Sequence, residues 1–296
     1  MNTLLLEIGT EEIPAGYIVP ALDAMSATLS KKLTDARIAH GQSKIYGTPR
    51  RLAVTIEGVA AKQLSVKSEV TGPPAHIGFD ANGKATMAGQ KFAEKVGVPP
   101  SKLEIKETPK GAYLTAEKRE RGLATQTLLK EILPAVILAT PFPKKMRWAG
   151  LDIEFARPIH NILALLGKSV VSFKLGNLKS GRYTHGHSFM APAKIKLNSP
   201  DEYLDKLRQA QVVADIQERK KILEQRIAVV ADELSGSILP DEELVDINNN
   251  LVEYPIPVAG NFDAEFLEVP DEILINAMRE HQKYFAVVDR NRNLMP

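Results

Sequence analysis

The sequence predicts an α+β fold, built from several small mixed α/β modules with mostly antiparallel sheets and a helix-rich C-terminal third. Short apolar runs of strand length dominate the first two thirds, whereas apolar residues recur at helical spacing after residue 198. With 296 residues, 44% of them hydrophobic, the chain is long enough for two or three domains.

The N-terminal region begins with a strand–helix–strand pattern. Residues 4–8 form an apolar run typical of a buried strand, and apolar side chains from Ile18 to Ala36 then follow helical spacing. Residues 51–59 predict a second strand. Proline and glycine at 72–74 and 109–111 bracket an inserted module at 68–110.

Within and after the insertion, further elements are predicted from periodicity and turn residues. The insertion has a turn at 80–83 and a helix at 86–96 that ends at Gly97. A strand at 112–118 and a helix at 123–133 come next, with Pro134 as a break or a new start. Later strands are expected at 153–155, 159–166, 170–175 and 193–197, with a loop or hairpin at 176–189.

Capping residues mark the helices of the C-terminal third. Ser199 begins a capping box, and Asp215 begins a helix that Gly236 ends. Helices at 241–251 and 270–281 precede a strand at 284–288, after which the chain stops where a partner strand should begin, as expected of a truncated chain. The predicted domains are 1–67 with 111–197, the insertion at 68–110, and 198–296.

Two regions carry opposite charge although the net charge is only +2. Residues 141–190 hold eight Lys and Arg against two acids, and residues 240–275 hold ten acids and no Lys or Arg. Such blocks either steer a polyanion towards the basic region or are solvated surface charge. The acidic block has no assigned role.

Several classes of protein and site are excluded or disfavoured. The absence of cysteine excludes disulfides, thiolate zinc sites and cysteine nucleophiles. No secretory signal or membrane span is recognisable, which predicts a cytoplasmic protein without membrane contact. The segment 78–85 lacks the Ser or Thr of a phosphate-binding loop at Ala85, so we interpret it as a turn.

The strongest local signal for nucleic-acid binding is Lys144-Lys145-Met146-Arg147-Trp148, where three cations flank the only tryptophan. The alternative is a solvated surface with Met146 and Trp148 packed inward. Weaker candidates for RNA contacts have the same cationic or hydrogen-bonding chemistry: Arg50, Arg51, Arg157, Arg182, His185, His187, Arg279 and Lys283.

The histidines and the N-terminal acids have alternative interpretations. His160, His185 and His187 lack the nearby carboxylates of a metal site, and Arg182, His185 and His187 suit phosphate contacts from a glycine-containing loop or an exposed polar loop. Glu11 and Glu12 suit a helix N-terminus better than acid–base catalysis. No metal site and no complete catalytic constellation is predicted.

Seven blocks, in order, resemble the bacterial glycyl-tRNA synthetase beta subunit family: LLLEIGTEEIPA (4–15), GTPRRL (47–52), MRW (146–148), FARPI (155–159), THGH (184–187), LVEYP (251–255) and MREHQKYF (278–285). Two positions depart from the family: Ser188 stands where Arg is frequent, and His160-Asn161 stands where Arg-Trp is frequent. The departures weaken phosphate or stacking roles at these positions.

The resemblance implies a ligase of two alpha and two beta subunits that charges tRNA(Gly) with glycine. It places ATP, Mg²⁺ and glycine activation on the alpha subunit, and tRNA binding on the beta subunit, with no cofactor in these 296 residues. Two rival functions stay open. One is a deacylase acting on aminoacyl-tRNA with His185 or His187 as base, and the other is an assembly scaffold whose acidic third contacts the alpha subunit.

Overall fold

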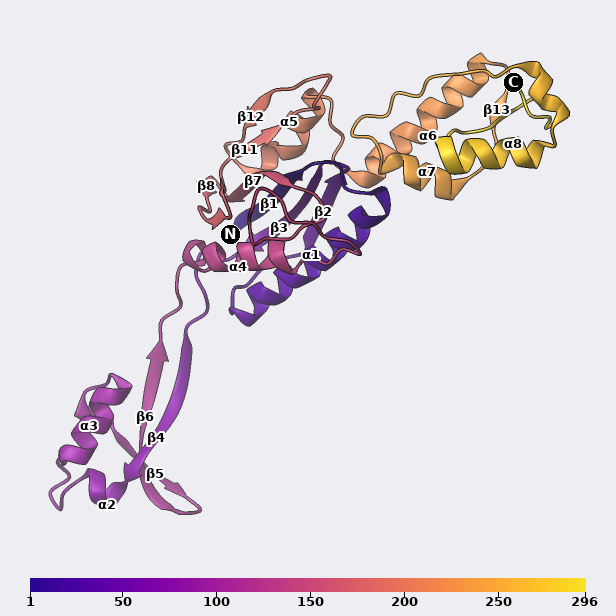
Figure 1. The fold of residues 1–296 in the computed structure, drawn as a ribbon. Coiled ribbons are helices and arrows are strands. Elements are labelled where there is room, and N and C mark those ends of the chain that lie inside the picture. Colours follow the sequence, from indigo (N-terminus) through magenta and orange to yellow (C-terminus); the bar gives the residue numbers. More distant parts are fainter. The chain divides into compact units, whose positions relative to one another are not determined.

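A five-stranded antiparallel sheet in the order β2-β3-β1-β7-β8 is the centre of the first part of the fold (Figure 1). Its strands are β1 (Asn2–Thr10), β2 (Ser43–Thr48), β3 (Arg51–Val59), β7 (Ile159–Leu166) and β8 (Ser169–Val170). The α+β prediction is confirmed. Strand β2 was not predicted, because its central Tyr46-Gly47 gives only a short apolar pattern.

The computed structural model describes residues 1–296, and these divide into two units. One unit combines Met1–Ala61 with Thr125–Pro296, and the other is Lys62–Ala124. The second unit is wider than the insertion expected at 68–110, because the strands that flank the insertion pair with each other from Val66 to Glu120. Residues 198–296 group with the first unit rather than forming a unit of their own.

Two helices, α1 (Ala15–Asp35) and α4 (Thr125–Ala139), pack on one face of the central sheet (Figure 1). Their buried side chains form one core with Leu4, Leu6 and Ile8 of β1. Helix α4 continues through Pro134, where the sequence predicted a break or a new start. Val136 and Ile137 beyond the proline are fully buried, and this packing offsets the hydrogen bond that proline cannot donate.

The opposite face of the sheet is covered by α5 (Tyr203–Gln209). Leu5 of β1 lies in this second core with Tyr46, Tyr203 and Leu207. Because successive side chains of a strand point to opposite faces, a strand with helices on both sides is apolar at every position, as residues 4–6 are.

Two short hairpins follow β8 in sequence. They pair β9 (Lys174–Leu175) with β10 (Leu178–Lys179), and β11 (Tyr183–His185) with β12 (Lys194–Lys196). The strand expected at 170–175 is therefore interrupted. The strand expected at 153–155 is reduced to one bridge between Met146 and Phe155.

The C-terminal third contains α6 (Ile216–Glu233), α7 (Glu242–Asn249) and α8 (Asp271–Ala277), with β13 (Ser237–Ile238) paired to β14 (Val287–Val288). The predicted cap at Asp215 is confirmed, since its side chain accepts from the amides of Gln217 and Glu218. Ser199 does not cap. The Glu202 carboxylate instead accepts from the Asn198 amide, and a 3-10 turn at Pro200–Glu202 leads into α5.

The end of this third differs from the prediction at its last helix, whereas the turn at 289–293 and the start of a partner strand at Leu294 are as predicted. The last helix changes to a π-helical turn at Met278–Gln282, and Lys283 ends it in the left-handed region. After β14, Leu294 forms a bridge with Val288, so pairing resumes beyond the turn at 289–293. A 3-10 helix at Ala264–Glu268 lies before α8.

The second unit has a three-stranded sheet in the order β4-β6-β5, formed by β4 (Val66–Pro74), β6 (Gly111–Glu120) and β5 (Glu104–Thr108). Helices α2 (Ala75–Gly78) and α3 (Met87–Val96) pack against it, and a 3-10 turn follows at Pro100–Lys102. Gly97 ends α3 in the left-handed region, as predicted.

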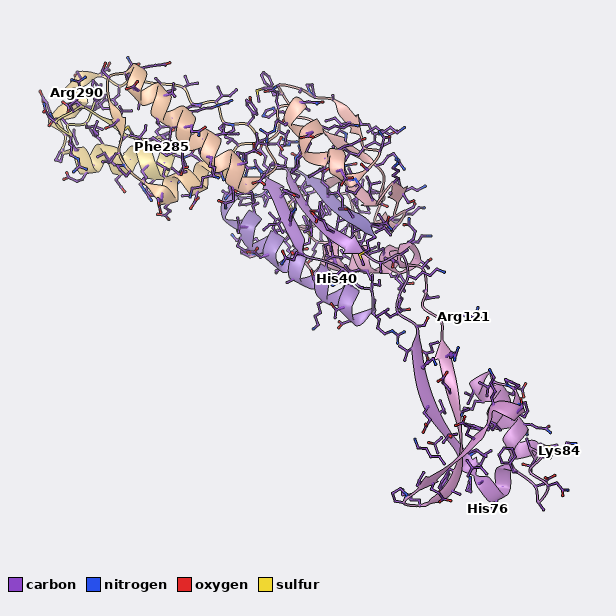
Figure 2. The ribbon with its side chains drawn as sticks, turned by 180° about the vertical axis from the view of Figure 1, so that it is seen from behind. His40, His76, Lys84, Arg121, Phe285 and Arg290 are labelled. Atoms are coloured by element: carbon purple, nitrogen blue, oxygen red, sulfur yellow. The ribbon has the colours of Figure 1, made fainter.

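The segment 78–85 of this unit is a turn, as we interpreted it. The Asp80 carboxylate accepts from the amides of Asn82 and Lys84, and the Lys84 side chain is exposed (Figure 2). Glycine at 78 allows close packing, because a Cβ there would lie 2.1 Å from the Leu114 side chain.

None of the helices in residues 1–296 combines the length and apolarity needed to cross a bilayer.

Candidate functional site

A cleft of about 260 Å³ opens at one end of the central sheet. Four segments far apart in sequence line it: the end of β1, the turn before β3, the start of β7 and the loop after β11. Its polar lining includes Arg50, His160, Asn161, His185 and Ser188. We call it the sheet-end cleft.

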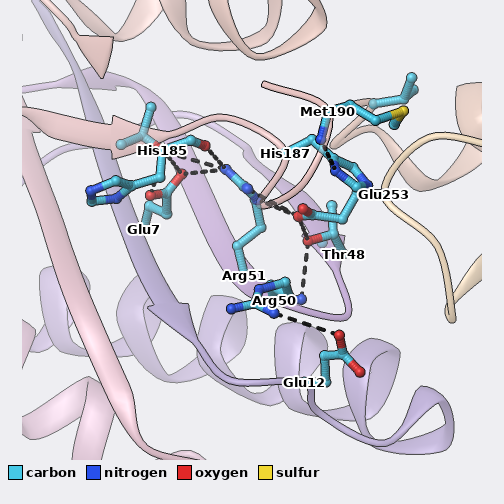
Figure 3. A network of polar contacts seen from close by, with 12 residues as sticks. Glu7, Glu12, Thr48, Arg50, Arg51, His185, His187, Met190 and Glu253 are labelled. Carbon is cyan, nitrogen blue, oxygen red and sulfur yellow. Dashed lines mark hydrogen bonds and ion pairs between the residues drawn. The ribbon is translucent and has the colours of Figure 1, made fainter. Parts of the chain in front are cut away.

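Beneath the cleft lies a buried charge cluster of Glu7, Arg51 and Glu253 (Figure 3). Arg51 is 5% exposed, and its Nη2 lies 2.9 Å from Glu253 Oε1, while its Nη1 lies 3.8 Å from Glu7 Oε2. Thr184 Oγ1 donates to both oxygens of Glu7, at 2.7 and 2.8 Å. Each charge therefore has a partner inside the protein.

Arg51 was a candidate for phosphate contact, and in the structure its guanidinium is buried and paired with two carboxylates. Burial opposes its charge, but the carboxylates of Glu253 and Glu7 offset burial and raise the pKa of the guanidinium above its ordinary value. Its remaining donors reach Thr184 Oγ1 and the carbonyl of His185. Arg51 holds β3, β11 and the 253 segment together, and its donors are occupied by protein groups.

Glu253 and Arg219 connect the C-terminal third to the same end of the sheet, and neither was predicted as a site residue. Thr48 Oγ1 donates to Glu253 Oε1 at 2.6 Å. Arg219, fully buried, donates to the carbonyls of Gly47 and Asn249, and burial lowers its pKa to about 10. A signal for Arg219 was present, because it shares the i, i+4 stripe of α6 with Leu223.

The rim of the cleft carries charges of both signs. Arg50 lies 3.6 Å from Glu11 and 3.5 Å from Glu12, which are ion-pair rather than hydrogen-bond distances (Figure 3 shows the pair with Glu12). His160 Nε2 lies 2.8 Å from Glu11 Oε1. Arg50 is therefore the candidate cation that remains at the cleft.

The structure separates His185 from His187. The His185 ring lines the cleft without a hydrogen-bond partner, and burial, aided by the nearby charges of Arg51 and Lys194, lowers its pKa despite Glu7. The imidazole is thus neutral at pH 7. His187 Nδ1 instead accepts from the amides of Phe189 and Met190 (Figure 3 shows the latter), so it stabilises its own loop.

The basic loop, residues 143–148, is a second candidate site in the same unit. Lys144 and Lys145 are exposed and make no ion pair or hydrogen bond. Arg147 is also exposed, and its Nε lies 2.9 Å from Glu154 Oε1. Trp148 packs against the main core, which favours an anchoring role over stacking on a base.

The other sequence candidates also contact protein groups. Arg157 donates to the carbonyl of Ala156, and Arg182 donates to the carbonyls of Leu197 and Lys168. Arg279 contacts three carboxylates, which raise its pKa: those of Asp241, Glu243 and Glu280.

Lys283 lies 3.6 Å from Glu280 at the end of the π-helical turn. Because Lys283 ends the turn in the left-handed region, it does not share a regular helix face with Arg279. Within residues 1–296, no group of three or more His, Cys, Asp or Glu side chains is placed to hold a metal ion.

The amino-acid sequence is similar to a known family of proteins over nearly its whole length. The family model described as the glycyl-tRNA synthetase beta subunit matches residues 4–296. The chain is 55% identical to the glycine–tRNA ligase beta subunit of Desulforapulum autotrophicum and 53% identical to that of Desulfatibacillum aliphaticivorans, over all of its length. It is 43% identical to that of Myxococcus xanthus over 99% of its length.

The chain spans 42–43% of the length of these relatives. Four of the seven blocks that resemble the family meet at the sheet-end cleft or directly beneath it: 4–15, 47–52, 184–187 and 251–255. More than half of these blocks therefore gather at one place in the fold. The chain belongs to the glycyl-tRNA synthetase beta subunit family.

Proposed function

We propose that the chain is the tRNA-contacting part of the beta subunit of a glycine–tRNA ligase, which joins glycine to tRNA(Gly) with ATP. Membership of the family and the names of the relatives support this role. The basic loop supplies the contact to the phosphates of the tRNA acceptor side.

The proposed RNA contact is inferred mainly from the exposure of Lys144 and Lys145 and from their lack of ion pairs. They are exposed and unpaired, whereas Arg51 and Arg279 are surrounded by carboxylates. Trp148 anchors the loop to the core, so the cations are presented from a fixed backbone. Free cations on an anchored loop release counterions when they meet phosphates, which supplies affinity without base specificity.

The rest of the proposal concerns the assembly. We place ATP, Mg²⁺ and glycine activation on an alpha subunit, in a cytoplasmic complex of two alpha and two beta subunits. The family resemblance supports this division, and the beta-subunit names of the relatives imply a partner subunit. Apart from the buried Glu253, the acidic block at 240–275 suits a protein neighbour rather than RNA.

The test is a titration of tRNA(Gly) against the chain at two salt concentrations. Replacing Lys144, Lys145 and Arg147 by Gln should lower affinity and reduce the slope of log K against log salt by roughly 2–3, for three lost phosphate contacts. The matched control removes three exposed, unpaired cations elsewhere: Lys221, Arg290 and Arg292.

An unchanged slope in the loop variant would contradict the basic-loop assignment. A chain that binds the alpha subunit but no tRNA at either salt concentration would instead support the scaffold function. The alpha subunit is therefore titrated in parallel under the same conditions.

A further inference from the structure

We propose that the sheet-end cleft receives one unpaired nucleotide of the bound RNA, with its base beside His160 and His185 and its phosphate on Arg50. This inference rests on the proposed RNA-binding function and assigns a separate ligand subsite within it. The basic loop contacts the phosphate backbone, whereas the cleft holds a single base.

The size of the cleft limits the ligand to one small group. At about 260 Å³, it lies just below the range of pockets that hold drug-sized molecules. A helical RNA segment is far too wide, but a base turned out of a single strand is of the right order. Proteins recognise RNA sequence mostly through such unstacked bases, by stacking and by hydrogen bonds to base edges.

The lining supplies both kinds of contact. His160 from β7 and His185 from the end of β11 line the cleft with imidazole rings, which are among the side chains that stack on bases. His185 has no partner for either ring nitrogen, and its lowered pKa keeps it neutral at pH 7, with one donor and one acceptor.

Asn161 predicts which bases are favoured. Its Nδ2 donates to the carbonyl of Tyr183 at 2.7 Å, which assigns the orientation of the amide. The Oδ1 is thereby left as an acceptor with no partner in the protein, on a side chain that lines the cleft. An acceptor there suits the exocyclic amino group of adenine, cytosine or guanine, and uracil has none.

The charges around the cleft explain why it takes one nucleotide and not a length of backbone. Arg50 retains donors, because its carboxylate neighbours are 3.5 and 3.6 Å away. Arg51 neutralises Glu7 beneath the floor. Glu11 and Glu12 flank Arg50 at the rim, so the cleft offers one cation for a single phosphate, and a longer polyanion is favoured at the basic loop.

The experiment titrates AMP, CMP, GMP and UMP separately into the chain, by calorimetry or NMR. AMP, CMP and GMP should bind more tightly than UMP. Asn161→Ala and His185→Ala should each weaken AMP binding roughly fivefold or more, since stacking and edge contacts are each worth about that much. His185→Phe keeps a stacking ring and should retain most of the affinity.

The controls are Asn261→Ala and His281→Ala, which remove exposed side chains without hydrogen bonds. Melting temperatures identify variants that do not fold. Equal binding of UMP and AMP, or AMP binding unchanged in both cleft variants, would overturn the proposal.

Binding of two RNA hairpins distinguishes a failure of this proposal from a failure of the proposed function. An RNA hairpin with a single-stranded 3′ overhang should bind more tightly than the blunt hairpin, and Asn161→Ala should remove that difference. If the loop variant weakens both RNAs while the cleft variants leave the overhang preference intact, the basic-loop function stands and the cleft inference fails. If neither RNA binds, both fail.

Discussion

The buried charge cluster and the basic loop show how differently this fold uses similar residues. Arg51 directly follows Arg50, Arg147 stands two residues after Lys145, and both suggested phosphate contacts. In the structure, Arg51 is 5% exposed between two carboxylates, whereas the Arg147 side chain is 67% exposed with one. The partner that decides the role of Arg51 is Glu253, 202 positions away.

The difference shows that the number of Lys and Arg in a segment says little about what they bind. A buried cation paired with buried carboxylates is a structural device, because its removal leaves the carboxylates uncompensated. An exposed cation contributes almost nothing to stability and keeps its charge for a ligand. The predictions below use stability and RNA binding to separate these two uses.

The largest effect is expected for Arg51→Met. The substitution leaves Glu7 and Glu253 buried without their cation, which should cost about 3–5 kcal/mol of the free energy of unfolding. Urea unfolding of the purified chain measures it. Arg147→Met is the matched control, and it should change the free energy by about 0.5 kcal/mol or less. Similar losses for the two variants would remove the distinction between the regions.

A smaller loss is expected for Glu253→Gln. The amide keeps an oxygen for Thr48 and Arg51 but loses the negative charge, and hydrogen bonds to charged groups are worth about 1.5–3 kcal/mol. The same unfolding measurement applies, with Glu265→Gln as the exposed control. No loss would mean that Glu7 alone compensates Arg51.

Local signals in the sequence predicted much of the fold. Asp215 and Gly97 mark helix boundaries through interactions within a few residues, and the structure has both. The continuous apolar run at 4–8 predicted a buried strand because burial on both faces leaves no alternation. These features do not depend on distant parts of the chain.

Features decided by long-range packing were missed or predicted wrongly. Helix α4 passes through Pro134 because the core holds its last turn. The sequence did not indicate that Arg51 pairs with Glu253 and Arg279 with Asp241, because these partners lie far away in the sequence. The cleft requires four segments to meet, and no spacing rule for a single segment could have found it.

Trp148 tests whether the basic loop works by charge alone. Its ring packs against the core, so Trp148→Phe should leave tRNA affinity within about twofold, with a stability loss of about 1 kcal/mol. Stacking on a base would contribute about 1–3 kcal/mol, and its loss would weaken binding by at least roughly fivefold. Because this is the only tryptophan, its fluorescence also reports RNA binding at the loop.

The smallest effect is expected at Glu202, a partly exposed acid outside both regions. The backbone amide of Asn198, then Lys206 and the Asn198 side chain, lower the pKa of its carboxyl to about 2. The folded pKa is lower than the ordinary value of 4.5, so its stabilising contribution is complete above pH 4.5 and is lost as pH falls towards 2.

An NMR titration of the Glu202 carboxyl measures this pKa directly. Lys206→Met should raise the pKa only part of the way to 4.5, because the largest cause, the Asn198 amide, is unchanged. A return to the ordinary value would mean that the ion pair dominates. The result shows whether a large pKa shift is accompanied by a large stabilisation. A solvent-accessible carboxyl can have a strongly lowered pKa and still add little to the free energy of unfolding. Arg51 in the buried charge cluster is instead expected to matter chiefly for stability.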